Sequence, residues 1–186
     1  QYHCAPIKNI PNMKTSDYDY VLPEHLIAQQ PLAVRTASRL LVLDALADTA
    51  KDETFLQLEG YINDNDLLVF NDTRVFPARL FGRKQTGGKI EVLVERILDD
   101  KTVLAHVRAS KSPRAGTVLI LEDSVRCVVD GREDELFILK QSSDTSWLSQ
   151  LQSHGHIPLP PYIQRADEQE DRERYQTVYA DKSGAV

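Results

Sequence analysis

The first group of residues suited to chemistry is the polar segment Asn71-Asp72-Thr73-Arg74. It directly follows the apolar run Leu67–Phe70, which is predicted to be a buried strand. Ligands of open α/β sheets bind beyond the carboxyl ends of the strands, where this segment would offer an amide, a carboxylate, a hydroxyl and a guanidinium. An Asx-type turn that links two domains would use the same residues, so both interpretations stay open at this point.

A second group lies near the C-terminal end of the sequence and reads Arg174-Tyr175-Gln176-Thr177-Val178-Tyr179. Its cation, aromatic rings, amide and hydroxyl could stack on and hydrogen-bond a nucleobase. An ordinary strand with aromatic core residues has the same composition. We predict that Asn71–Arg74, Arg79 and Arg174–Tyr179 line one polar cleft that binds the substrate.

Cations gather in the middle of the sequence. Residues 77–114 carry nine Lys/Arg and four Asp/Glu, whereas residues 13–76 carry five and eleven, and residues 115–186 carry seven and thirteen. A local basic field can steer a polyanion toward a protein whose formal net charge is −6. The candidate contacts to nucleic-acid phosphates are Arg83, Lys84, Arg108 and Lys111. A solvated barrel face is the alternative interpretation.

Other chemistries find little support in the sequence. His154 and His156 have no Cys or acidic partner at a useful metal-ligand spacing, so no metal site is predicted. Phosphate-binding Walker loops, dinucleotide-type glycine motifs and hydrolase nucleophile motifs are absent from the sequence. Of the two cysteines, Cys4 lies in the segment before Met13, and Cys127 is predicted to be a small buried hydrophobe, which fits a reducing cytoplasm. No apolar run approaches the ~20 residues of a membrane-spanning helix.

The elements that must position these residues show two different sequence patterns. Before Ala78 the sequence predicts helices at Pro23–Gln30 and Thr54–Ile62, and strands buried on both faces at Arg39–Asp44 and Leu67–Phe70. Six short strands separated by turn residues follow, which is typical of a small antiparallel barrel or sandwich. They are Ala78–Arg83, Lys89–Leu98, Thr102–Ala109, Thr117–Leu121, Val125–Asp130 and Leu136–Lys140.

After Gln141 the pattern of short strands ends. Trp147–Ser153 is predicted to be helical, and the prolines of Gly155–Tyr162 exclude regular structure there. The predicted architecture is therefore an α/β domain, formed by residues 13–76 and 142–186, with a small antiparallel β-barrel inserted at residues 77–141. Residues 1–12 precede Met13 and are interpreted as a leader outside the fold.

Taken in order, several blocks of the sequence resemble the S-adenosylmethionine:tRNA ribosyltransferase-isomerase family of queuosine biosynthesis. Each block is modest alone, and their matching order and spacing carry the resemblance from Ser16 to Val186. The blocks are Ser16–Gln29, Ser38–Asp44, Asp66–Val75, Pro77–Lys84, Gly87–Leu93, Gly155–Ile163 and Arg174–Ala180.

The resemblance implies an enzyme that uses S-adenosylmethionine as a ribosyl donor rather than as a cofactor or methyl donor. The ribosyl group would pass to the amine of 7-aminomethyl-7-deazaguanine at the tRNA wobble position and be isomerised. The products would be epoxyqueuosine-tRNA, adenine and methionine. The partners implied are tRNA and S-adenosylmethionine, with no membrane and with the oligomeric state open.

Two departures from the family pattern stand out. Asn63–Asp66 replaces a Pro-Gly turn, and the sequence stops at Gly184-Ala185-Val186 where family members continue. We therefore expect the α/β domain to be incomplete and the chain to be an inactive fragment. Asp72, Tyr175 or a residue beyond this chain could be the catalytic base. A non-catalytic nucleic-acid-binding barrel and a small-molecule-binding or structural fragment are the competing hypotheses.

Overall fold

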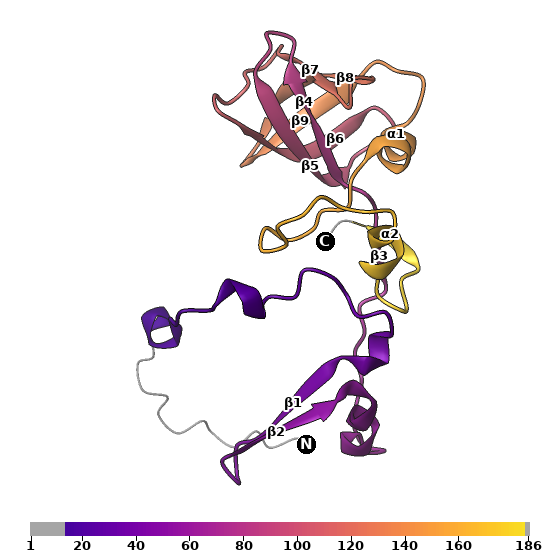
Figure 1. The fold of residues 1–186 in the computed structure, drawn as a ribbon. Helices are drawn as coiled ribbons and strands as arrows, with labels where there is room; N and C mark the ends of the chain where they lie inside the picture. Colours follow the sequence, from indigo (N-terminus) through magenta and orange to yellow (C-terminus); the bar gives the residue numbers. More distant parts are fainter. Residues whose placement is uncertain (1–13, 185–186) are drawn as a thin grey trace, which may run out of the picture.

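The computed structural model describes residues 14–184 (Figure 1). The leader expected at residues 1–12 lies outside the described residues. The central feature is a closed antiparallel barrel, as the sequence predicts. Its strand order is β4-β5-β6-β9-β8-β7. Its strands are β4 (Arg79–Lys84), β5 (Lys89–Ile97), β6 (Thr102–Ala109), β7 (Val118–Leu121), β8 (Val125–Glu133) and β9 (Leu136–Gln141).

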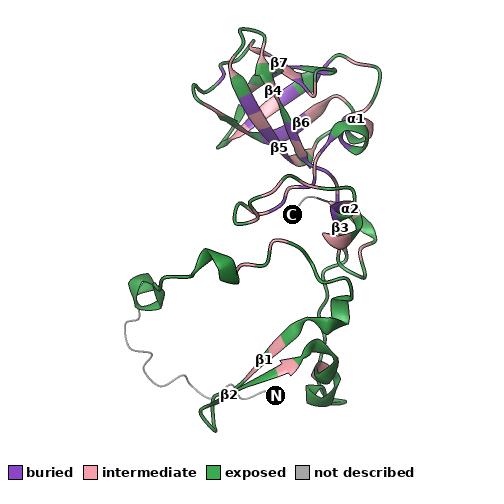
Figure 2. Cartoon of the chain, in the orientation of Figure 1, coloured by how far each residue is buried: buried purple, intermediate pink, exposed green. Residues whose placement is uncertain are grey.

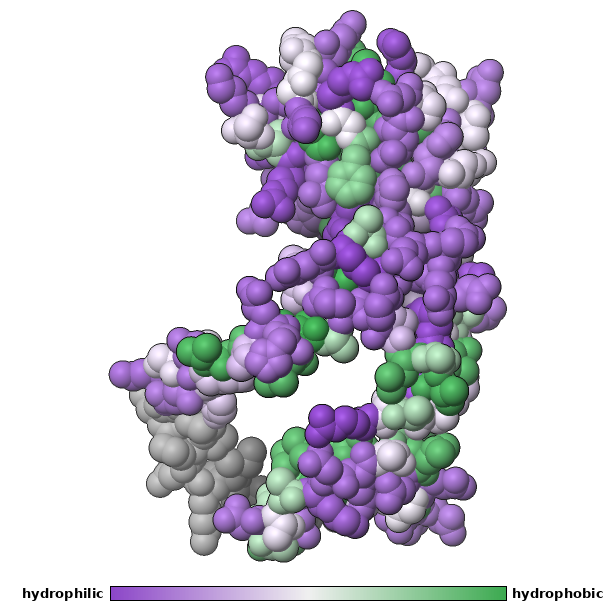
Figure 3. Space-filling model, in the orientation of Figure 1, coloured by the Kyte–Doolittle hydropathy of each residue, from purple (hydrophilic) through white to green (hydrophobic). Residues whose placement is uncertain are grey.

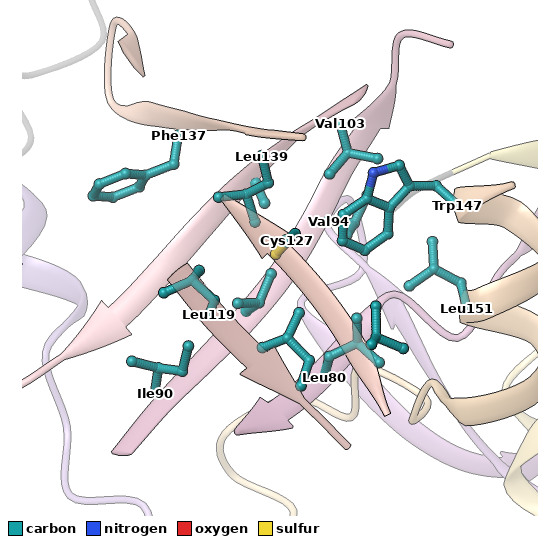
Figure 4. Packing of buried hydrophobic residues seen from close by; sticks show 14 of the residues in the cluster. Leu80, Ile90, Val94, Val103, Leu119, Cys127, Phe137, Leu139, Trp147 and Leu151 are labelled. Carbon is teal, nitrogen blue, oxygen red and sulfur yellow. The ribbon is translucent and has the colours of Figure 1, made fainter. Parts of the chain in front are cut away.

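Alternation of inward and outward side chains builds the barrel core. In β5, Ile90, Val92 and Val94 are buried, while the residues between them face outward. Figure 4 shows Ile90 and Val94 in one hydrophobic cluster with Leu119 of β7 and Cys127 of β8. Burial raises the pKa of the Cys127 thiol to about 12. The prediction that Cys127 is a buried hydrophobe is confirmed.

Helix α1 (Trp147–His154) contributes to the same core as the barrel. Trp147 and Leu151 are fully buried within it, and the indole Nε1 of Trp147 donates to the Lys101 carbonyl at 2.9 Å. The helix begins after Ser146, whose hydroxyl accepts from the Ser149 amide. It ends at Gly155, where no larger residue fits, because a Cβ would lie 1.9 Å from the Pro77 carbonyl.

The N-terminal segment differs from the prediction. Arg39–Asp44 forms strand β1, but it pairs antiparallel with β2 (Thr49–Thr54) in an exposed hairpin. The Asp44 carboxylate accepts the amides of Leu46 and Ala47, which closes the hairpin turn. The prediction of burial on both faces is therefore wrong, since no further strand pairs with this hairpin among residues 14–184.

The other predicted elements of this segment are shorter than expected or absent. Residues 67–70 form no strand and their side chains are exposed, with Leu67 at 87%. The predicted helices become 3-10 helices at Glu24–Leu26 and Phe55–Tyr61. Figure 2 shows buried residues concentrated in the barrel and its neighbouring loops, and Figure 3 shows hydrophobic side chains on the surface of the N-terminal segment.

Between the hairpin and the barrel lie strand β3 (Thr73–Val75), helix α2 (Asp171–Arg174) and strand β10 (Lys182–Gly184) (Figure 1). β10 pairs parallel with β3. An incomplete α/β domain is not confirmed by these elements, and the division of the chain at residues 76–77 and 141–142 stays a prediction. In the described part of the chain, no helix is long and apolar enough to cross a membrane.

Candidate functional site

The two polar segments singled out in the sequence meet beside β3. The hydroxyl of Thr177 donates to the Asn71 carbonyl at 3.1 Å, and the rings of Phe70 and Tyr179 lie 4.7 Å apart. Segments more than 100 residues apart in the sequence are thus in direct contact, which the predicted shared cleft requires.

The side chain of Gln176 fixes this contact. Its Oε1 accepts the Val75 amide and its Nε2 donates to the Val75 carbonyl, both at 2.8 Å. The amide group therefore bonds the edge of β3 as a neighbouring strand would. β10 occupies the other edge, where the Phe76 amide donates to the Gly184 carbonyl at 3.3 Å.

The first polar segment combines a turn with an ion pair. Asn71 Oδ1 accepts the Thr73 amide at 2.9 Å, which is the Asx-type turn that the sequence left open. Asp72 Oδ2 lies 3.2 Å from Lys182 Nζ, and the Asp72 carbonyl accepts the amides of Asp181 and Lys182. Arg74 lies in β3 and is exposed. The segment therefore anchors β10 through its backbone.

Arg79 connects the barrel to the proline-containing loop. Its backbone exchanges two hydrogen bonds with His156, and its Nη2 donates to the Leu159 carbonyl at 3.1 Å. Its Nε lies 3.1 Å from Glu91 Oε1. The guanidinium is therefore held on the outer face of β4, where its charge reaches the neighbouring Tyr175.

Tyr175 is suited to donating a hydrogen bond rather than to accepting a proton. Its hydroxyl donates to the Pro158 carbonyl at 3.3 Å. Burial, assisted by Tyr162, raises the pKa of Tyr175, and the nearby charge of Arg79 only partly offsets this. A phenol with a raised pKa keeps its proton at neutral pH, which argues against Tyr175 as the catalytic base.

Arg174 ties the second segment to the N-terminal part of the chain. Its Nη2 donates to the Leu32 carbonyl, and its own carbonyl accepts from Arg35 Nη2 at 3.2 Å. Its Nε is buried and has no hydrogen-bond partner within the described residues.

Five of the predicted substrate-binding residues line three cavities. Arg79 and Tyr175 line a cavity of about 410 Å³, together with Pro158–Pro161. Tyr175 and Arg174 line another of about 280 Å³. Arg74 and Gln176 line a third of about 240 Å³. Tyr175 forms part of the wall of two cavities.

Sequence reasoning missed the pair that supports the second cavity. Arg165 forms a two-pronged ion pair with the buried Asp171, with N–O distances of 2.6 and 2.8 Å. Hydrogen bonding to this guanidinium lowers the pKa of Asp171. Arg165 Nε also donates to the Gln29 carbonyl, while Gln29 Oε1 accepts the Gln164 amide. The spacing of Arg165 and Asp171 matches no periodic pattern that could have indicated the pair.

His156 lies between two carboxylates. Its Nδ1 is 2.8 Å from Asp167 Oδ1, and its Nε2 is 3.6 Å from Glu122 Oε2. Asp167 Oδ2 also accepts the Ile157 amide. The part of the chain that the structure describes contains no cluster of His, Cys, Asp and Glu able to hold a metal ion. His156 therefore links the proline-containing loop to the barrel.

Two of the four predicted phosphate contacts are engaged within the protein. Arg83 Nη1 pairs with Asp123 Oδ1 at 2.5 Å, and Lys84 Nζ donates to the Lys111 carbonyl. Arg108 and Lys111 are exposed and have no ion-pair partner among residues 14–184. The basic segment is thus less available to a polyanion than its composition suggests.

Comparison with known proteins agrees with the family resemblance seen in the sequence. The sequence model of a family described as queuosine biosynthesis protein matches residues 15–186. The chain is also similar to the solved S-adenosylmethionine tRNA ribosyltransferase from Thermotoga maritima, with 33% identity and a TM-score of 0.37. That alignment covers 75% of this chain and 48% of the Thermotoga protein, so this chain spans about half its length. Because the family match extends over nearly the whole chain, the chain belongs to the queuosine biosynthesis protein family.

Proposed function

We propose that the protein containing this chain is a tRNA ribosyltransferase-isomerase of queuosine biosynthesis. It transfers the ribosyl group of S-adenosylmethionine to the amine of 7-aminomethyl-7-deazaguanine in the tRNA wobble position and isomerises it. Epoxyqueuosine-tRNA is formed, and adenine and methionine leave. The family match and the 33% identity to a protein described as an S-adenosylmethionine tRNA ribosyltransferase support this reaction class.

The observation that carries the proposal is the pair of cavities that share Tyr175. A reaction between a nucleoside donor and a modified base requires two ligand groups to meet at one place. The cavity beside Arg174 offers the tyrosines 162 and 175 and an unpaired buried guanidinium nitrogen, which suit a heterocycle. The cavity beside Arg79 lies on the barrel side of the same tyrosine.

The chemistry begins at the sulfonium of S-adenosylmethionine. Positive sulfur acidifies the neighbouring ribosyl carbon, so a base can remove its proton before the amine attacks. We propose that Tyr175 orients a ligand through its protonated hydroxyl and that the base is another group. Asp72 is one candidate, because its carboxylate is half exposed beside β3 and held by Lys182.

Adenine release tests the proposal. The complete protein is incubated with S-adenosylmethionine and a tRNA that carries the precursor base, and free adenine is measured by chromatography. The proposal predicts adenine release that depends on the precursor base. Binding of the tRNA without any adenine release would favour a non-catalytic nucleic-acid-binding barrel instead.

A further inference from the structure

The outer face of the barrel contains a further hollow, larger in volume than the three cavities described above, that the proposed reaction does not use. It is formed by β4, β5, β6 and the turn before β8, and it encloses about 830 Å³. Three cations line it, namely Arg83, Lys89 and Arg108. Three carboxylates, Glu91, Glu122 and Asp123, line it as well, so the formal charge of the lining is balanced.

The hydrogen bonds and ion pairs change this balance. Glu91 pairs with Arg79 from outside the hollow, and Asp123 pairs with Arg83. Glu122 accepts the Phe81 amide at 2.5 Å and faces His156. All three carboxylates therefore have internal partners.

Two cations are left uncommitted by these pairings. Lys89 and Arg108 are exposed, lie on the adjacent strands β5 and β6, and have no ion-pair partner among residues 14–184. They can therefore bind an external anion without breaking an existing ion pair.

An aromatic side chain completes the site. The ring of Phe81 lines the hollow and is 45% exposed. Glu122 holds its backbone with two bonds, because the Phe81 amide donates to the Glu122 carboxylate and the Phe81 carbonyl accepts the Glu122 amide at 2.8 Å. The ring of His156 supports it in an edge contact at 5.2 Å. A fixed, exposed ring beside free cations is the arrangement that binds unpaired nucleotides.

We propose that this hollow binds a single-stranded stretch of RNA, with one base stacked on Phe81 and its phosphates on Lys89 and Arg108. A polymer fits better than a free nucleotide because uncommitted cations continue beyond the hollow at Lys111 and Arg114, in the loop after β6. The inference rests on the proposed function, since the RNA it implies is a loop of the tRNA substrate. Among the candidate phosphate contacts, Lys89 takes the place of Arg83 and Lys84, because those two side chains bind partners within the protein.

The test measures the affinity of the complete protein for a fluorescent anticodon stem-loop RNA at several salt concentrations. The double variant K89A/R108A should bind more weakly, and the slope of log affinity against log salt should fall by about 1.4, or about 0.7 for each phosphate contact. F81A should weaken binding about 5- to 140-fold without changing the slope. R126A is the matched control, because Arg126 faces outward on β8, directly across the barrel from β5.

The outcomes separate this inference from the proposed function. Unchanged affinity and salt slope in K89A/R108A, with RNA binding and adenine release intact in the wild type, would overturn the inference alone. Competition of the RNA by adenosine monophosphate at equal affinity would show that the hollow takes a free nucleotide, which also overturns it. A wild-type protein that binds no RNA would remove the proposed function as well. Far-UV circular dichroism and thermal melting confirm that each variant is folded.

Discussion

The amide group of Gln176 offers the sharpest test of how the two polar segments are held together. In Gln176→Ala, the amide and carbonyl of Val75 both lose a partner at 2.8 Å. Val75 is only 8% exposed, so water replaces these bonds poorly. An unsatisfied buried polar group costs about 1–3 kcal/mol. We expect about 2–6 kcal/mol of local destabilisation for the two groups, equal to roughly 30- to 20,000-fold in an opening equilibrium.

Amide hydrogen exchange of β3 measures this opening directly. The Val75 amide should exchange about 30- to 20,000-fold faster in Gln176→Ala than in the wild type. Gln176→Glu keeps the oxygen acceptor and loses only the donor, so the Val75 amide should stay largely protected. Thr177→Val is the control, because it removes one exposed bond to Asn71 and should change exchange by about two-fold or less. Unchanged exchange in Gln176→Ala would refute the argument.

Three further predictions follow from the packing. Gly155→Ala should lower the stability by about 1–3 kcal/mol, measured as a lower melting temperature, because its Cβ meets the Pro77 carbonyl. Arg165→Ala should lower the midpoint of chemical denaturation, since it leaves Asp171 without its partner. The lowered pKa of Asp171 means that this pair stabilises the fold fully above about pH 4 and less as the pH falls further, so the variant should lack that acid-dependent loss. The Cys127 thiol, with its pKa raised to about 12, should resist alkylation at pH 8 until urea unfolds the barrel.

Each of these predictions has a control or a contradicting result. Gly60→Ala should leave the melting temperature unchanged or slightly raised, because nothing lies within 4 Å of the added carbon. An acid-unfolding curve of Arg165→Ala that matches the wild type would show that Asp171 gains nothing from the pair. Labelling is followed by peptide mass spectrometry. Equal alkylation rates of Cys127 in the native and the unfolded protein would contradict the burial argument.

The barrel could be predicted from the sequence because its signals are local. In residues 89–94 every second residue is apolar and faces inward, and Gly87-Gly88 marks the turn before them. The N-terminal segment could not be predicted in the same way. The apolar run at residues 67–70 has the composition of a buried strand, but composition does not show whether a partner strand exists. The strand Thr49–Thr54 was missed because its sequence is mostly polar.

The candidate site shows the same limit. Its two polar segments were found from their residue types, but their actual contacts depend on tertiary structure. The bonds between Gln176 and Val75 join residues 101 positions apart, and no periodic pattern indicates them. Charge counts indicated a basic segment, yet they could not show that Arg83 is paired with Asp123 and that Lys89 is free. Local composition therefore identifies candidate residues, and the fold determines which of them remain available.

The fate of labelled S-adenosylmethionine tests the central claim most directly. The complete protein is given precursor-bearing tRNA and either ribosyl-labelled or methyl-labelled S-adenosylmethionine, and the label in purified tRNA is counted. A ribosyltransferase-isomerase places the ribosyl label in the tRNA and leaves the methyl label in free methionine. Methyl label in the tRNA, or no label from either donor, would contradict the proposed function.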